Sequence, residues 1–207
     1  MVKASGVILA GGKSRRMGED KAVLPVGKGE MIARVALVLK QVFPEVLVVG
    51  GCRQTGEKLG LRVVQDIIEG CGPLGGIHAA LRSISHDRCL VAACDMPFIS
   101  APLAAHMVER SAGYDVAVPR RGRFLEPLFA VYTVNCLFAV EELLLAGGRK
   151  VTDFFPRVRV KYLDEGELGD LADLDAAFFN VNTPLDLEKA RWMAGGARVQ
   201  EGGGAGI

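Results

Sequence analysis

One short loop near the N-terminus concentrates small and cationic residues. Its segment Ala10-Gly11-Gly12 lacks bulky side chains, so the backbone N–H groups can closely approach anionic oxygens. Four cations follow within nine residues, namely Lys13, Arg15, Arg16 and Lys21. Because a triphosphate carries several negative charges, the loop predicts a phosphate-binding site. From these residues alone, a tight turn with a solvated basic segment stays an equal alternative.

Two other glycine motifs compete with this interpretation. Gly12-Lys13-Ser14 resembles the end of a P-loop, but the first glycine of that motif would fall on Val7, inside an apolar run. The segment from Gly70 to Gly75 reads G-x-G-x-x-G, as in dinucleotide-binding proteins. Four residues separate it from the preceding predicted strand, at Asp66-Ile67-Ile68-Glu69. We therefore regard a dehydrogenase built on this motif as the weaker alternative.

Two aspartates follow predicted strands and could serve the same ligand. Asp95 comes after an apolar run and precedes Pro97, which fixes the backbone beside it. A carboxylate in this position can hold magnesium while substrate phosphates and water complete the coordination. Asp66 follows the run Arg62 to Gln65. Both aspartates could instead form turns, which are common at strand ends.

Two amides lie near the C-terminus, at Asn180 and Asn182. On an extended segment, residues two apart project to the same side, where amides can donate to phosphate or read the edge of a heterocycle. They could equally satisfy backbone groups ahead of the helix that Thr183-Pro184 begins.

Apolar runs and helical repeats alternate along the chain. Predicted strands lie at 7–9, 46–49, 62–65, 89–93 and 115–118, and predicted helices at 31–43, 74–85 and 100–112. This alternation is typical of parallel strands joined by helical crossovers. A hairpin turn at Arg121-Gly122-Arg123, leading to a strand over 128–132, predicts a mixed-sheet excursion. Helices over 134–146 and 184–193 complete the predicted fold.

The predicted fold class is α/β, a Rossmann-like three-layer α/β/α arrangement with a mostly parallel, mixed sheet. Ligands of such sheets bind beyond the carboxyl ends of the strands. The residues there are Gly11 to Lys21, Gly50 to Arg53, Asp66 and Asp95. The separate candidate groups should therefore meet at one edge.

Five motifs together resemble the nucleotide-sugar-type nucleotidyltransferases, and among these the molybdenum cofactor guanylyltransferases. The motifs span 9–21, 64–66, 72–76, 94–98 and 179–184, in the order of that family. The resemblance covers the chain from Val7 to about Arg191. It implies the nucleotide-diphospho-sugar transferase type of fold and a Mg²⁺-dependent reaction that transfers GMP from GTP to molybdopterin or the molybdenum cofactor, releasing pyrophosphate.

The resemblance also implies roles for individual residues. Nucleotide binding falls to Leu9, Ala10, Gly11, Gly12, Lys21, Asp66 and Asp95. Catalysis falls to Arg16, Lys21 and Asp95, with Asp95 also the magnesium ligand. Substrate binding on the acceptor side falls to Pro127, Asn180 and Asn182. Glu126, in the same segment as Pro127, could accept hydrogen bonds from a pterin ring, with a surface ion pair as an equal alternative.

One departure from the family concerns the nucleotide base. Many guanylyltransferases carry an asparagine just past the second long strand, where this sequence has Gly51. Transfer of CMP to the same cofactor and use of another nucleotide by this fold therefore stay open as alternatives. A non-catalytic nucleotide-binding module is a separate alternative, and the presence of Lys21, Asp95 and the basic loop together argues against it.

Composition limits the remaining classes of function. The 207 residues are 50% hydrophobic and 24% charged, with a formal net charge of +1. No concentrated basic run indicates a nucleic-acid partner, and no apolar segment approaches the length of a membrane span. Five cysteines without a C-x-x-C pair favour a reducing, cytoplasmic location. We expect one nucleotidyltransferase domain over 1–194, a flexible Gly-rich tail over 195–207, and transient contact with molybdoenzyme maturation proteins.

Overall fold

Helices and strands alternate along the first half of the chain, as predicted. The computed structural model describes residues 2–11, 21–51 and 53–195, with the backbone alone at Lys21. Its strands are β1 (Ser5–Leu9), β2 (Pro25–Val26), β3 (Gly29–Glu30), β4 (Glu45–Val49), β5 (Arg62–Val64), β6 (Arg88–Ala93), β7 (Val116–Arg121), β8 (Phe124–Leu125), β9 (Phe129–Thr133) and β10 (Val160–Asp164). Its helices are α1 (Met31–Val42), α2 (Arg53–Leu59), α3 (Gly72–Ser83), α4 (Ala101–Arg110), α5 (Leu137–Leu145), α6 (Glu165–Leu168), α7 (Leu174–Ala177) and α8 (Pro184–Gly195), with 3-10 turns η2 (Lys21–Val23), η3 (Val134–Cys136) and η4 (Val151–Arg157).

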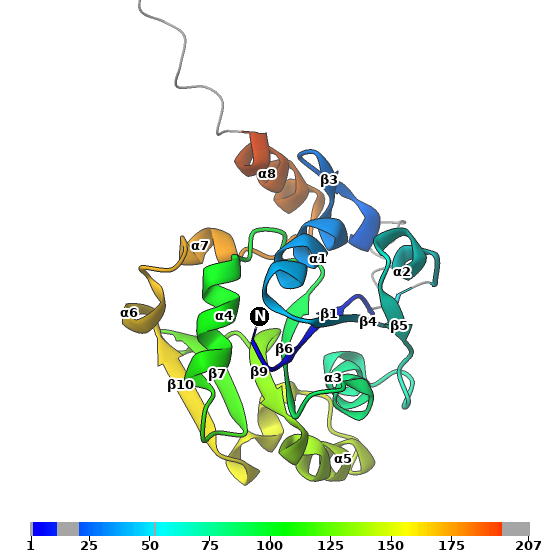
Figure 1. The fold of residues 1–207 in the computed structure, drawn as a ribbon, viewed down its shortest axis with the longest axis vertical. Coiled ribbons are helices and arrows are strands. Elements are labelled where there is room, and N and C mark those ends of the chain that lie inside the picture. Colours follow the sequence, from blue (N-terminus) through cyan, green and yellow to red (C-terminus); the bar gives the residue numbers. More distant parts are fainter. Residues whose placement is uncertain (1, 12–20, 52, 196–207) are drawn as a thin grey trace, which may run out of the picture.

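The main sheet has the strand order β10-β7-β9-β6-β1-β4-β5, with β8 paired to β7. Strands β6, β1, β4 and β5 are parallel neighbours, whereas β9 is antiparallel to both β6 and β7. The predicted hairpin at Arg121-Gly122-Arg123 forms between β7 and β8, and Gly122 adopts a positive φ of 55° there. The mixed sheet is thus confirmed, with helices on both of its faces (Figure 1).

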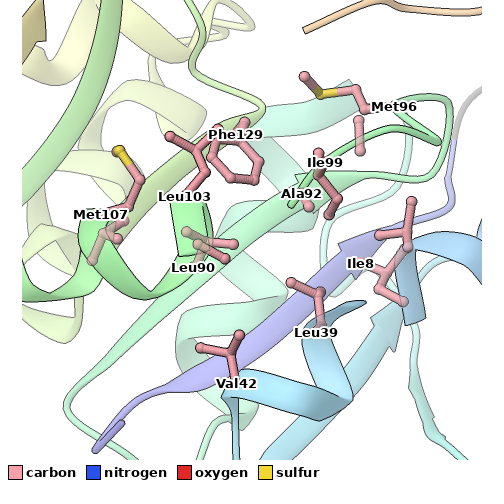
Figure 2. Packing of buried hydrophobic residues seen from close by; sticks show 14 of the residues in the cluster. Ile8, Leu39, Val42, Leu90, Ala92, Met96, Ile99, Leu103, Met107 and Phe129 are labelled. Carbon is pink, nitrogen blue, oxygen red and sulfur yellow. The ribbon is translucent and has the colours of Figure 1, made fainter. Parts of the chain in front are cut away.

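The two faces of the sheet carry separate apolar cores. On one face, Ile8 of β1 packs in a cluster with Leu39 of α1 and Leu103 of α4 (Figure 2). On the other face, Val7 belongs to a cluster with Ile77 of α3 and Val140 of α5. Successive side chains of a strand point to opposite faces, so covering both faces buries every residue of β1. This explains why the central strands read as continuous apolar runs.

Local sequence signals account for the helix ends. Helix α1 buries residues at helical spacing and ends at Val42, just before Phe43-Pro44. Ser100 caps α4 as expected, because its hydroxyl accepts a hydrogen bond from the N–H of Leu103 at 3.3 Å.

Helix α8 extends to Gly195, the first residue of the predicted tail, and residues 196–207 lie outside the described residues. In the part of the chain that is described, no helix is both long and apolar enough to cross a membrane.

An ion pair between the buried Asp115, just before β7, and the exposed Arg159, just before β10, joins these two strands. Asp115 is 8% exposed and accepts two hydrogen bonds from the Arg159 guanidinium, one from the Arg159 backbone N–H, and one from Asn135. The Arg159 side chain, more than any other group, holds the pKa of Asp115 well below its ordinary value.

This depressed pKa predicts a specific loss of stability in acid. The contribution of Asp115 should be complete above its unfolded pKa of about 4 and disappear as the pH falls toward the folded value. We expect Asp115→Asn to lower the free energy of unfolding by about 2 kcal/mol at neutral pH. Urea unfolding should show this difference from the wild type shrinking between about pH 4 and pH 2. The exposed Asp170→Asn serves as the control, and a pH-independent difference at Asp115 would contradict the assignment.

Candidate active site

A cavity opens at the carboxyl ends of β1, β4, β5 and β6. Its walls come from segments far apart in the sequence. The lining residues are Leu9, Ala10, Gly11, Ala22, Val49, Asp66, Gly72, Pro73, Gly76, Ala93, Cys94, Asp95, Leu128 and Asn182. The cavity thus lies at the edge of the sheet where the strand-end rule predicts a ligand site.

The glycine loop begins where β1 leaves the sheet. The N–H of Ala10 donates to the carbonyl of Val49 at 2.9 Å, and that of Cys94 donates to the carbonyl of Leu9 at 3.0 Å. These bonds extend the backbone pairing beyond the strands, so the loop leaves the sheet in a fixed direction. Leu9, Ala10 and Gly11 all line the cavity.

Close backbone approach explains the glycine at position 50 of this edge. A Cβ on Gly50, whose φ is +74°, would lie 2.7 Å from the Cα of Gly11. Real side chains do not tolerate that contact, so the loops after β1 and β4 can meet only through glycine. Of the other predicted loop residues, Gly12 and Arg16 lie outside the described residues. Lys21 begins η2, directly before the cavity residue Ala22.

Asp66 lies on the wall beyond β5. Burial, and secondarily the charge of Glu69, raises the pKa of this half-buried carboxyl. A Cβ on the neighbouring Gly76 would lie 3.9 Å from Asp66 Oδ1 and 3.0 Å from Leu9 Cδ2. Gly76 thus keeps the floor of the cavity open between Leu9 and Asp66.

The G-x-G-x-x-G segment does not form a strand-to-helix turn. Strand β5 ends at Val64 and α3 begins at Gly72, within the motif, so residues 65–71 lie between them. A dinucleotide fingerprint opens its helix directly after the strand, and this geometry differs. Nevertheless, Gly72, Pro73 and Gly76 line the cavity. Reasoning from individual residues gave them no site role, and the signal that could have identified them was the family resemblance over 72–76.

Asp95 is half-buried, stands just past the end of β6 and lines the same cavity as the beginning of the glycine loop. Its backbone carbonyl accepts a hydrogen bond from the N–H of Val181 at 3.0 Å. The C-terminal segment is therefore bonded directly to the loop that carries the predicted magnesium ligand.

The residues predicted to bind the acceptor do not all line the cavity. Asn182 lines the cavity, whereas the amide of Asn180 donates to the carbonyl of Phe178 at 3.0 Å and is not among the lining residues. Pro127 is also outside the lining; its carbonyl accepts a hydrogen bond from the Tyr132 hydroxyl at 2.7 Å. The next residue, Leu128, reaches the cavity instead.

Glu126 faces a second, more open concavity with Arg121 and Glu165. Burial raises the pKa of the Glu126 carboxyl, and the charge of Arg121 opposes this shift. Glu126 and the glycine-loop cavity are connected along the chain through Pro127-Leu128.

Gly51 occupies a tight place beside the glycine loop. Its φ is +72°, and an added Cβ would lie 3.2 Å from the Cβ of Ala10. Its carbonyl accepts a long hydrogen bond of 3.5 Å from Gln65 Nε2. Because glycine has no side chain, only the backbone N–H and C=O groups at this position can form hydrogen bonds with a nucleotide base.

Together, these features suit phosphate-ester chemistry. A loop of small residues can present backbone N–H groups to phosphates, while two carboxylates and an amide line the same cavity from three other segments.

Comparison with known proteins assigns this arrangement to a family. The MobA-like NTP transferase domain matches residues 6–160. A relative from Pelotomaculum thermopropionicum, named as a probable molybdenum cofactor guanylyltransferase, is 60% identical over 96% of this chain and 97% of its own length. A molybdenum cofactor guanylyltransferase from Syntrophotalea carbinolica is 34% identical over 90% of each chain.

A solved structure has a similar fold. The molybdopterin-guanine dinucleotide biosynthesis protein A from Archaeoglobus fulgidus superposes with a TM-score of 0.81 at 30% identity, covering 93% of this chain and 99% of that protein. By sequence and by fold, the chain belongs to the MobA-like NTP transferase family.

Proposed function

We propose that this protein transfers GMP from GTP to a phosphate of molybdopterin or the molybdenum cofactor and releases pyrophosphate. The observation that carries the proposal is the meeting of Ala10-Gly11, Asp66, Asp95 and Asn182 at one cavity. Relatives that align along nearly the whole chain are named for this reaction. Nucleotidyl transfer needs a triphosphate and an acceptor phosphate side by side. This cavity offers polar groups on the predicted nucleotide side and on the predicted acceptor side.

The protein's own groups would align the reactants and neutralise charge. The loop from Leu9 to Gly12 would surround the phosphates of GTP, with the N–H groups of Gly11 and Gly12 as donors because that of Ala10 already bonds the Val49 carbonyl, and Asp66 would contact the nucleotide. Asn182 would orient the acceptor phosphate for in-line attack on the α-phosphorus, and pyrophosphate would leave opposite. Arg16 and Lys21 would stabilise the charge that develops on the α-phosphate and the leaving group. No general base is required, because the acceptor phosphate is already ionised.

Asp95 is the residue we propose to hold Mg²⁺. It is half-buried at the edge of the cavity, where a carboxylate can face both a bound nucleotide and an acceptor. Among the described residues, no three His, Cys, Asp or Glu side chains gather into a metal cluster. A single carboxylate suits Mg²⁺, which keeps several waters and binds substrate phosphates. When bound, the ion would lower the repulsion between the two anionic substrates.

We also propose a cytoplasmic location and a brief contact with the maturation proteins of molybdoenzymes for transfer of the product. The free thiols of Cys71, Cys89 and Cys136 are compatible with a reducing compartment.

The base preference can be tested by pyrophosphate release. With molybdopterin and Mg²⁺ present, we expect GTP to be used at least about 10-fold more efficiently than CTP, ATP or UTP. The comparison between GTP and CTP is the most informative, because Gly51 has no side chain and leaves base recognition near β4 to the backbone. Release with CTP alone would replace guanylyl by cytidylyl transfer. No release with any of the four nucleotides would favour a non-catalytic binding module.

A further inference from the structure

A third apolar core lies apart from the two that cover the sheet. It joins the C-terminal helix α8 to the β2–β3 hairpin, and Figure 1 shows the two side by side. Its buried members are Leu24, Val26, Met31, Val181, Leu187 and Ala190. Arg191 strengthens this junction, because its Nε donates to the carbonyl of Pro25 at 3.1 Å.

This third core lies next to three predicted site residues along the chain. Leu24 follows Lys21 by three residues, and Val181 directly precedes Asn182. Phe98, three residues after Asp95, packs against the same core from its edge. The segments that must act together on the nucleotide and the acceptor thus pack against the same apolar core.

Val181 connects this core to the cavity. Its side chain is 0% exposed, and its N–H donates to the carbonyl of Asp95 at 3.0 Å. The residue is therefore fixed at both its side chain and its backbone. Because Asn182 is the next residue, this attachment determines where the Asn182 backbone starts.

Asp186 fixes Asn182 from the other side. Its Oδ2 accepts hydrogen bonds from the backbone N–H of Asn182 at 3.0 Å and of Thr183 at 2.8 Å. The Thr183 hydroxyl accepts the N–H of Asp186 in return, at 3.2 Å. This reciprocal pair resembles a capping box at the beginning of α8. It leaves the Asn182 backbone held between the helix and the Asp95 loop, while Asn182 lines the cavity.

We propose that Val181 and Asp186 are positioning residues that hold the Asn182 side chain in register with Asp95. The inference rests on the proposed acceptor role of Asn182. Neither residue needs to touch substrate, and both act through the backbone on either side of Asn182. Loss of either support should impair use of the acceptor while binding of GTP stays nearly unchanged.

Two variants with matched controls test the proposal. Val181→Ala is paired with Val140→Ala, a valine that is also 0% exposed but lies in the core beneath α5. Asp186→Ala is paired with Asp173→Ala, whose carboxylate likewise accepts two backbone N–H groups, at the beginning of α7. Asp186 is near the surface, so its variant should fold even if Val181→Ala does not. We expect kcat/KM for molybdopterin to fall by about 10-fold to 100-fold in both test variants. KM for GTP should stay within about 2-fold, and the controls should match the wild type.

A double-mutant cycle separates positioning from general loss of stability. In an Asn182→Ala background, Val181→Ala and Asp186→Ala should each add less than about 2-fold, because the group they position is already gone. Val181→Ile, which keeps a branched side chain, should restore most of the activity. Additive losses, or test variants that behave like their controls, would overturn the inference while an active wild type upholds the proposed function. A wild type that releases no pyrophosphate with GTP would overturn both.

Discussion

Replacing Lys21 by alanine is expected to lower turnover by about 10³-fold. Lys21 begins η2, and the adjacent Ala22 is 1% exposed and lines the cavity. A cation at this place would offset the negative charge that develops as the bond between the α- and β-phosphates breaks. Since that charge is greatest in the transition state, the loss should appear in kcat more than in KM for GTP. Initial rates of pyrophosphate release at saturating GTP and molybdopterin measure it directly.

The control for this prediction is a lysine from the same part of the chain. Lys28 lies exposed in the turn between β2 and β3, so Lys28→Ala removes one charge without approaching the cavity. It should retain wild-type turnover. Circular dichroism and thermal unfolding should be alike for both variants, because Ala22 and Leu24, which are buried, are untouched. Turnover of Lys21→Ala within about 3-fold of the wild type would remove Lys21 from the mechanism.

The central part of the fold was predictable because its physical cause is local in sequence. β1 and β6 are covered on both faces, so Val7 to Leu9 and Cys89 to Ala93 form continuous apolar runs. Helix α1 has one apolar face, and its burial produces the spacing that the sequence shows. The hairpin at Gly122 was visible because its turn requires a positive φ.

The elements that the sequence analysis did not anticipate depend on distant partners. Helix α2 buries only Thr55 and Gly56, so it has no apolar face to detect. It packs because Gly56 lies against Val63; an added Cβ would lie 2.1 Å from Val63 Cγ2. Strand β10 is an edge strand with partly exposed and charged residues, and it is held by pairing with β7 and by the bonds between Arg159 and Asp115. None of these interactions can be recognised from a short stretch of the amino-acid sequence.

The candidate site was likewise predictable where a residue's position depends on local sequence, and not where it depends on distant partners. Gly11, Asp66 and Asp95 were placed together because each ends a parallel strand, and such ends meet at one edge. Leu128 and Val49 complete the wall, but apolar side chains carry no chemical signal of a site. The alternation argument put Asn180 and Asn182 on one side of an extended segment, yet the amide of Asn180 is engaged by the Phe178 carbonyl. That turn is specified by packing around Phe178 and Val181, which are both buried.

Replacing Asp95 by asparagine is expected to lower turnover by about 10²-fold to 10³-fold and to raise the Mg²⁺ concentration needed for half-maximal rate. The substitution keeps the shape of the side chain but removes its charge, which is what a hard divalent cation requires. The backbone carbonyl of Asp95, which accepts the N–H of Val181, is unchanged, so the support of Asn182 should persist. The fold should therefore remain intact while the response to Mg²⁺ changes. Titration of pyrophosphate release with Mg²⁺, and its loss with EDTA, measures both effects.

Two further aspartates make this result specific. Asp170→Asn removes an exposed carboxylate outside the cavity and should leave both turnover and Mg²⁺ dependence unaltered. Asp66→Asn changes a carboxylate that lines the same cavity but is proposed to contact the nucleotide, so it should raise KM for GTP at an unchanged Mg²⁺ requirement. If Asp95→Asn instead behaved like Asp66→Asn, Asp95 would be a nucleotide contact and the metal would need another site. The two carboxylates line one cavity, so the Mg²⁺ titration together with KM for GTP assigns them different roles.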